Sequence, residues 1–170
     1  KLLTTLSEID ADIYGLVEIE NEFQTDQNSD GLVAINVLVD ALNGLDQYAP
    51  GTWAAVDPGS PFVETGDAIS VGMIYKTTSV SVDLSSVEIL TDADLADLPG
   101  DYGDGPVFDG ASTNRAPLAA TFTDLGSGED FTVAVTHMKS KGGTGTGGDA
   151  DLGDGAGNFN ETRTEGVEAL

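Results

Sequence analysis

Apolar and polar residues alternate along the chain in a pattern that predicts helices at both ends and strands between them. Apolar residues recur at helical spacing within residues 1–12, and residues 158–170 return to a helical pattern. A further helix is expected over residues 31–42, with Asp30 as its N-cap and an apolar stripe along one side. Strands are expected at 13–19, 52–56, 67–76, 80–90, 118–124 and 131–137, and the last two are expected to form a hairpin. One short helical piece is expected between residues 91 and 109.

This order of elements predicts an α/β fold in a single domain over residues 1–170. The expected order, α-β-α-β-β-β-β-β-α with short antiparallel connections, favours strands sandwiched between outer helices. A chain of 170 residues is long enough to bury a sizeable core. No window reaches the roughly 18 apolar residues of a membrane span, so no membrane partner is expected. The lack of cysteine excludes disulfides, thiolate zinc sites and a cysteine nucleophile.

The acidic residues change the picture most, because 30 of them face only six lysines and arginines, for a formal charge of −24. They are spread along the chain, which argues against a disordered acidic tail. A protein from a halophilic source is our first interpretation, since salt screens self-repulsion, and a calcium-rich extracellular protein is the alternative. We therefore expect stability and activity to rise with salt or divalent ions. Generic nucleic-acid binding through a basic face is implausible, so phosphate recognition must depend on a few local cations or a bound metal.

Side chains suited to chemistry occur where predicted strands end. Glu18 enters an apolar strand, where a carboxylate is costly unless it is paired or binds a metal, and its oxygens suit Mg²⁺. His137, the only histidine, ends another strand and can transfer protons near neutral pH. Arg115 can hold two phosphate oxygens, and Asp67 can orient the imidazole. Together these groups suit metal-assisted attack on a phosphoester, although solvated strand ends with one surface histidine are the plain alternative.

The motifs around these residues resemble the endonuclease/exonuclease/phosphatase family, the deoxyribonuclease I-like enzymes, and within it the secreted bacterial nucleases. The segments DADIYGLVEIEN, GDAISVGMIYK, NRAPLAATF, VTHMKSKGG and GNFNETR occur in the family's order and cover nearly all of the chain. LVEIEN and THMKSKG are the most specific of them. The resemblance implies a four-layer α/β/β/α sandwich with mainly antiparallel strands. It also implies phosphodiester hydrolysis that depends on a divalent metal, Mg²⁺ first, with Mn²⁺ or Ca²⁺ as alternatives.

The resemblance implies roles for individual residues as well. Glu18 matches the metal-binding glutamate, His137 the active-site histidine, and Arg115 the arginine next to the substrate phosphate. Asp67 falls near the acid that supports the histidine, in a loosely aligned segment. Weaker matches for contact with the substrate phosphate are Lys139, Lys141 and Asn160. DNA is expected as substrate ahead of RNA, and an extracellular location follows from the family; the oligomeric state is left open.

The chain departs from the family pattern at both ends. No counterpart is found for three family segments: the early Asn-containing strand, the later GD-x-N segment and the terminal Ser-Asp-His segment. We therefore interpret residues 1–170 as a partial domain that lacks the second catalytic histidine. We expect this chain alone to show little nuclease activity. Three alternatives stay open: a lipid or sugar phosphoesterase of the same fold, a non-catalytic relative used for binding, and a calcium-binding secreted module. The last is suggested by the Gly- and Asp-rich segment 142–157, which composition predicts to be a flexible loop.

Overall fold

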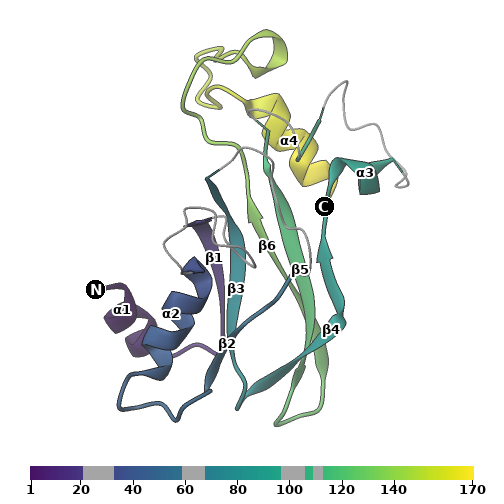
Figure 1. The fold of residues 1–170 in the computed structure, drawn as a ribbon. Coiled ribbons are helices and arrows are strands. Elements are labelled where there is room, and N and C mark those ends of the chain that lie inside the picture. Colours follow the sequence, from purple (N-terminus) through teal and green to yellow (C-terminus); the bar gives the residue numbers. More distant parts are fainter. Residues whose placement is uncertain (21–32, 59–67, 97–105, 109–112) are drawn as a thin grey trace. The chain divides into compact units, whose positions relative to one another are not determined.

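The fold is mixed α/β, with two small antiparallel sheets (Figure 1). The computed structural model describes residues 1–20, 33–58, 68–96, 106–108 and 113–170. One sheet has the strand order β1-β3-β2 and the other the order β4-β5-β6. The elements along the chain are α1 (Leu2–Ile9), β1 (Ile13–Glu20), α2 (Ala34–Asn43), β2 (Trp53–Ala55), β3 (Ile69–Lys76), β4 (Val80–Ile89), α3 (Asp92–Leu95), β5 (Arg115–Asp124), β6 (Asp130–His137), the short 3-10 helix η1 (Gly147–Asp149) and α4 (Asn160–Glu168).

The chain forms two compact units, which we describe separately. The first unit comprises Lys1–Ile89 and Leu118–Val135, and the second comprises Leu90–Pro117 and Thr136–Leu170. The first therefore holds α1, α2, the sheet β1-β3-β2 and most of the sheet β4-β5-β6. The second holds α3, η1, α4 and the strand ends that carry Arg115 and His137.

In the first unit, α1 and α2 lie on one face of the sheet β1-β3-β2 (Figure 1). The buried residues of α2 are Ile35, Val39 and Leu42, whose spacing of four and three residues forms one stripe. That stripe packs against Trp53 of β2 in a single buried cluster. The amide of Asn43 fixes the end of α2 to the same strand, since it accepts the Trp53 N–H at 2.8 Å and donates to the Trp53 carbonyl at 3.0 Å.

The other face of this sheet packs against the sheet β4-β5-β6. Tyr75 of β3 meets Phe122 of β5 edge-on, with ring centroids 5.6 Å apart. A Cβ atom at Gly15 of β1 would come within 2.8 Å of Cγ2 of Val135, so only glycine permits this approach of the two sheets. The first unit thus has a helix layer, a sheet layer and a second sheet layer. The full four-layer sandwich stays a prediction.

Both sheets have a bulge in an edge strand. Between the pairs Leu16–Gly72 and Ile19–Ser70, β1 has two residues, Val17 and Glu18, where β3 has only Val71. In the other sheet, residues 84–87 of β4 lie opposite the single residue Ala120 of β5. Bulges bend a strand and re-aim its side chains, and they are common at sheet edges.

Most predicted boundaries shift by one to three residues, and the starts of α2, β5 and β3 bear on predicted caps or site residues. The predicted start of α2 at residue 31 is wrong, because the helix begins at Ala34 and Val33, in extended conformation, is its N-cap. Asp30, the predicted cap, lies outside the described residues. β5 begins at Arg115 instead of Leu118, since the carbonyl of Pro117 accepts the Leu90 N–H at 3.1 Å and continues the ladder without an N–H of its own. β3 begins at Ile69, and Asp67 also lies outside the described residues.

Lys76 joins the end of β3 to the end of α1. Its side chain is only 9% exposed, and its Nζ atom lies 2.8 Å from Oδ1 of Asp10 and 2.8 Å from the Asp10 carbonyl oxygen. Asp12 lies at 3.8 Å, and the ring of Trp53 lies under the ammonium at 5.4 Å. The hydroxyl of Tyr48 donates a second bond to Asp10 at 2.7 Å. This cluster holds the left-handed turn at Asp10, where α1 stops.

The Asp10 cluster predicts a specific dependence of stability on pH. The bonds from Lys76 and then from Tyr48 hold the pKa of Asp10 below its usual range. Because the folded-state pKa is lowered, the stabilisation is complete above the unfolded value of about 4 and is lost as the pH falls through the folded value. We expect Asp10→Asn to be less stable near neutral pH and to lose stability less steeply between about pH 5 and pH 2.

Urea unfolding at constant salt, followed by Trp53 fluorescence, measures this slope. Asp46→Asn is the matched control, because it removes the same charge from an exposed turn and should keep the wild-type slope. Equal slopes for Asp10→Asn and the wild type would contradict the assignment.

Candidate phosphate- and metal-binding residues

The predicted site residues divide between the two units. Glu18 lies on β1 in the first unit. The second unit contains five of the others, namely Arg115, His137, Lys139, Lys141 and Asn160. Asp67 lies outside the described residues. The proximity of Glu18 to the second-unit residues therefore stays a prediction, while the second-unit residues can be compared directly.

Arg115 and His137 are neighbours at one end of the β5–β6 ladder. The side-chain oxygen of Asn114 accepts the Lys139 N–H at 2.9 Å, which sets these two positions opposite each other. In an antiparallel pair with constant register, Ala116 then lies opposite His137, and Arg115 is the next residue along β5. Both side chains are half-buried, and Nε of Arg115 and Nδ1 of His137 are buried atoms. Because successive side chains of a strand point to opposite faces, this register places Arg115 and His137 at the same end of the ladder but on opposite faces of the sheet, and their approach to one phosphate stays a prediction.

Asn114 holds this strand end together. Only 2% of the residue is exposed, and its amide nitrogen donates to the carbonyls of Val107 at 3.1 Å and Thr162 at 2.7 Å. With the bond from the Lys139 N–H, one side chain connects the start of β5, the segment after β6 and α4. On α4, a Cβ atom at Gly166 would collide with the Asn114 amide, so a glycine is required where the helix meets it. Arg115 and His137 are fixed by this packing.

The segment 142–157, for which composition predicts a flexible loop, has a hydrogen-bond pattern centred on Asn158. Oδ1 of Asn158 accepts the N–H groups of Gly145 at 3.1 Å and Asp151 at 3.2 Å, and its amide nitrogen donates to the Gly143 carbonyl at 2.9 Å. Five of its glycines adopt positive φ, which lets the chain turn repeatedly around this amide.

Arg163 of α4 binds the same segment from its other side. Its guanidinium donates to the carbonyls of Asn158 at 2.8 Å, Ala156 at 2.9 Å and Lys139 at 3.3 Å. It also lies 3.5 Å from the side-chain oxygen of Asn160. Arg163 therefore ties the segment that follows His137 to the start of the helix that bears Asn160.

The aspartates of the segment are bound to backbone groups and do not form a shared cation site. Asp149 accepts the Thr162 N–H at 2.9 Å and its hydroxyl at 2.5 Å, which caps α4. Asp151 and Asp154 each accept an N–H two residues further on, at 2.9 Å. Within the described ranges, no group of three or more His, Cys, Asp or Glu side chains is arranged to hold a metal ion.

Glu18 has an unusual backbone for its residue type. It adopts φ 57 within the β1 bulge, is exposed, and is one of three described non-glycine residues with positive φ. The left-handed conformation costs an L-residue other than glycine about 1–2 kcal/mol, and such strain concentrates at functional sites. A carboxylate at a bulge that re-aims the side chain is consistent with a metal ligand.

Sequence reasoning missed three residues that organise the second unit. Asn114 belonged to the motif NRAPL, yet only the arginine received a role. Asn158 and Arg163 flank Asn160 in GNFNETR, but only Asn160 received a role. For Arg163, the available signal was the scarcity of basic residues, because a chain with only six of them is not expected to place one on an ordinary helix surface without a binding partner.

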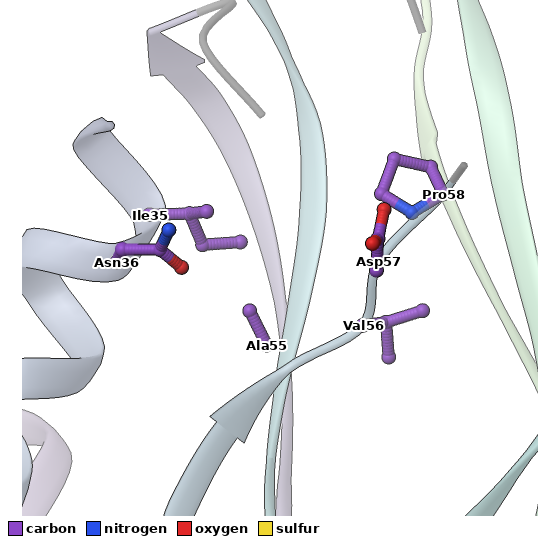
Figure 2. A pocket seen from close by; sticks show the side chains of 6 residues that line it. All are labelled: Ile35, Asn36, Ala55, Val56, Asp57 and Pro58. Atoms are coloured by element: carbon purple, nitrogen blue, oxygen red, sulfur yellow. The ribbon is translucent and has the colours of Figure 1, made fainter. Parts of the chain in front are cut away.

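A small hollow of about 140 Å³ lies in the first unit between the start of α2 and the end of β2 (Figure 2). Asn36 and Asp57 supply its polar groups, and Ile35, Ala55, Val56 and Pro58 complete the lining. Residues 21–32 and 59–67, which adjoin this lining in sequence, lie outside the described part, so we assign the hollow no ligand.

Across the residues that the structure describes, no helix has the length and apolar character needed to cross a membrane. Comparisons of the chain with protein-family models, with curated proteins and with solved structures found no match.

Proposed function

We propose that this chain carries part of the active site of a divalent-metal-dependent phosphodiesterase, an extracellular nuclease that acts on DNA. The observation that carries the proposal is that Arg115 and His137 are both half-buried at the same end of the β5–β6 ladder. Their strand positions point to opposite faces, so the approach of both side chains to one phosphate at this end of the sheet is part of the proposal. The guanidinium suits a phosphate and the imidazole suits proton transfer, so the pair fits a phosphoester better than other substrates. The helix, sheet and sheet layers of the first unit support an α/β/β/α sandwich of the endonuclease/exonuclease/phosphatase type.

In this proposal each residue has a separate task. Arg115 holds the phosphate and keeps its charge at all relevant pH values. His137 moves a proton or stabilises charge on the attacked phosphate, with Asp67 orienting its ring. Glu18 is the ligand for a Mg²⁺ ion, which, when bound, would stabilise charge on the phosphoryl oxygens and lower the pKa of a bound water.

A titration of the single histidine tests the proposal on this chain. Because His137 is the only histidine, its ring Cε1–H resonance is identified without assignment. We expect a short thymidine oligonucleotide with Mg²⁺ to shift this resonance, and Arg115→Gln to weaken the effect at least tenfold, the loss of one charged hydrogen-bonded pair. Lys1→Gln removes a positive charge from the first unit and is the control. A resonance that does not respond to the oligonucleotide would count against the proposal.

Hydrolysis is tested on the domain expressed together with any coding sequence that flanks it. Cleavage of plasmid DNA should require Mg²⁺ and fall by about 10²-fold or more in His137→Ala. Turnover of sphingomyelin or inositol phosphates with no turnover of DNA would replace the nuclease by a lipid or sugar phosphoesterase. Full activity in both Glu18→Ala and His137→Ala would remove catalysis by this site altogether.

A further inference from the structure

β6 is an edge strand that lacks the protection of the other edge strands. A sheet edge exposes unpaired N–H and C=O groups, and proteins protect it with bulges, charges or very short strands. β1 and β4 each have a bulge and exposed acids, and β2 has only three residues. β6 has eight residues and carries no acid after Asp130, its first residue, and within the described part of the chain only β5 pairs with it.

The ladder between β5 and β6 shows which backbone groups of β6 point outward. The Asp124 N–H donates to the Glu129 carbonyl at 2.9 Å, and the hydroxyls of Thr121 and Thr132 lie 2.9 Å apart, so the two contacts share one register without a bulge between them. Hydrogen-bonded positions alternate along an antiparallel strand, beginning here with Glu129. The exposed residues whose N–H and C=O groups point away from β5 are therefore Asp130, Thr132 and Ala134.

The composition of β6 is that of a strand with covered edges. The longest stretches of the chain without Asp or Glu are 68–82, 110–123 and 131–148. The first contains β3 and the second contains nearly all of β5, which are the central strands of the two sheets. The third contains β6 from its second residue onward, although β6 lies at an edge. In a chain with 30 acids, this similarity indicates that another strand covers the β6 edge.

We propose that a second copy of this chain covers it, and that the two β6 strands pair antiparallel about a two-fold axis at Thr132. Thr132 then lies opposite Thr132 of the second copy, and Asp130 lies opposite Ala134. Each of the outward N–H and C=O groups thereby gains a partner. One sheet continues through both copies.

The charges around β6 select this orientation. Glu129 and Asp130 stand at the start of the strand, whereas Lys139 and Lys141 follow its end. Antiparallel pairing brings the acidic start of one strand toward the end of the other that leads to the lysines, while parallel pairing in register would set acid beside acid. The pairing ends before His137, so this inference is independent of the proposed function.

The net charge predicts that the pairing depends on salt. Each copy carries a formal charge of −24, so the two copies repel each other in dilute buffer. Molar salt reduces the Debye length to about 3 Å and removes most of this repulsion, while hydrogen bonds between the strands are retained. The dimer should therefore form in molar KCl and dissociate as KCl is removed.

Sedimentation velocity of the 170-residue chain tests the inference over a range of KCl in which Trp53 fluorescence stays constant. We expect the dimer to increase with KCl and with protein concentration. Ala134→Pro removes an N–H that points outward and leaves the ladder to β5 complete. The two-fold axis makes this a loss of two hydrogen bonds, so the dissociation constant should rise at least about tenfold.

Two further sets of variants make the result specific. Ala134→Ser retains the N–H and should dimerise as the wild type does. Thr132→Lys and Thr132→Glu each place like charges opposite one another across the axis, so each alone should dimerise more weakly. An equal mixture of the two should restore a mixed dimer, and this test remains decisive if Ala134→Pro folds poorly.

A chain that stays monomeric in molar KCl overturns the inference, and so does an Ala134→Pro variant that dimerises as the wild type does. Failure of the Thr132→Lys and Thr132→Glu mixture to restore the dimer overturns the two-fold axis at Thr132. Amide hydrogen exchange at Thr132 and Ala134 gives the last check, because their exchange should slow as the dimer forms. If the chain expressed with its flanking coding sequence is a monomer with both amides protected, the same polypeptide covers the edge and the second copy is overturned.

Discussion

Replacing Asn114 by alanine is expected to lower the free energy of unfolding by about 3 kcal/mol. The amide is buried and makes three hydrogen bonds, to Val107, Thr162 and Lys139. Each bond contributes about 1 kcal/mol, and the partly buried Lys139 N–H also loses its acceptor. Urea unfolding at constant salt, followed by far-ultraviolet circular dichroism, measures the change. Asn36→Ala, an exposed asparagine on α2, is the matched control and should change little.

Gly166 provides an internal check on the Asn114 contact. Alanine normally stabilises a helix relative to glycine by about 1 kcal/mol, yet here its Cβ would collide with the Asn114 amide and lie 3.1 Å from the Met138 sulfur. We expect Gly166→Ala to be destabilising in the wild type and clearly less so in Asn114→Ala, where the space is vacated. Additive effects in this double-mutant cycle would contradict the direct contact.

The secondary structure was predictable from periodicity because the core residues follow it. The apolar spacing of α1 and of Ile35, Val39 and Leu42 in α2 identified both helices, and apolar runs of strand length identified β3 and β5. The start of α2 was not predictable, because Asp30 is a favourable N-cap residue by type, whereas the observed N-cap three residues later, Val33, has no capping side chain. The start of β5 was predicted after Pro117 for a similar reason. A strand can contain a proline where only the proline carbonyl is needed for the ladder.

The site was only partly predictable, for a different reason. Residue type and strand ends drew attention to Arg115 and His137, and both residues lie at the same end of the β5–β6 ladder, while their joint action stays a prediction. The roles of Asn114 and Arg163 depend on partners up to 48 residues away and on backbone carbonyls, and neither kind of partner can be recognised in the local composition. The glycine-rich segment 142–157 read as flexible because composition reports the freedom of the unfolded chain, whereas Asn158 and Arg163 determine its folded conformation.

Substitution of Glu18 by glycine is expected to affect stability and metal binding in opposite directions. We expect Glu18→Gly to leave the free energy of unfolding unchanged or to raise it by up to about 1 kcal/mol, because glycine adopts φ 57 without strain. The side chain is exposed, so no core packing is lost, and one negative charge is removed from a strongly acidic unit. The greater freedom of glycine in the unfolded chain offsets part of the gain. Urea unfolding measures the change.

Glu88→Gly is the matched control for this effect. It also removes an exposed glutamate from an edge strand next to a bulge, but Glu88 is not among the residues with positive φ. Glycine in an ordinary strand position destabilises by roughly 0.5–1 kcal/mol, so the two substitutions should act in opposite directions. Destabilisation of similar size at both positions would show that the bulge imposes no strain on Glu18.

Metal binding gives the second half of the Glu18 prediction. If the carboxylate is a ligand, Mn²⁺ should broaden the amide resonances of residues 16–19 at low concentration in the wild type, and Glu18→Gly should require at least tenfold more metal, the loss of one charged ligand contact. Glu18→Gln removes the charge but retains the side chain and most of the backbone preference, so it should lose the metal without the gain in stability that comes from relief of backbone strain. A glutamate that binds no metal but still strains the chain would have no chemical reason to replace glycine at this bulge. The combination of gained stability and lost metal binding is therefore the result that identifies Glu18 as a functional residue.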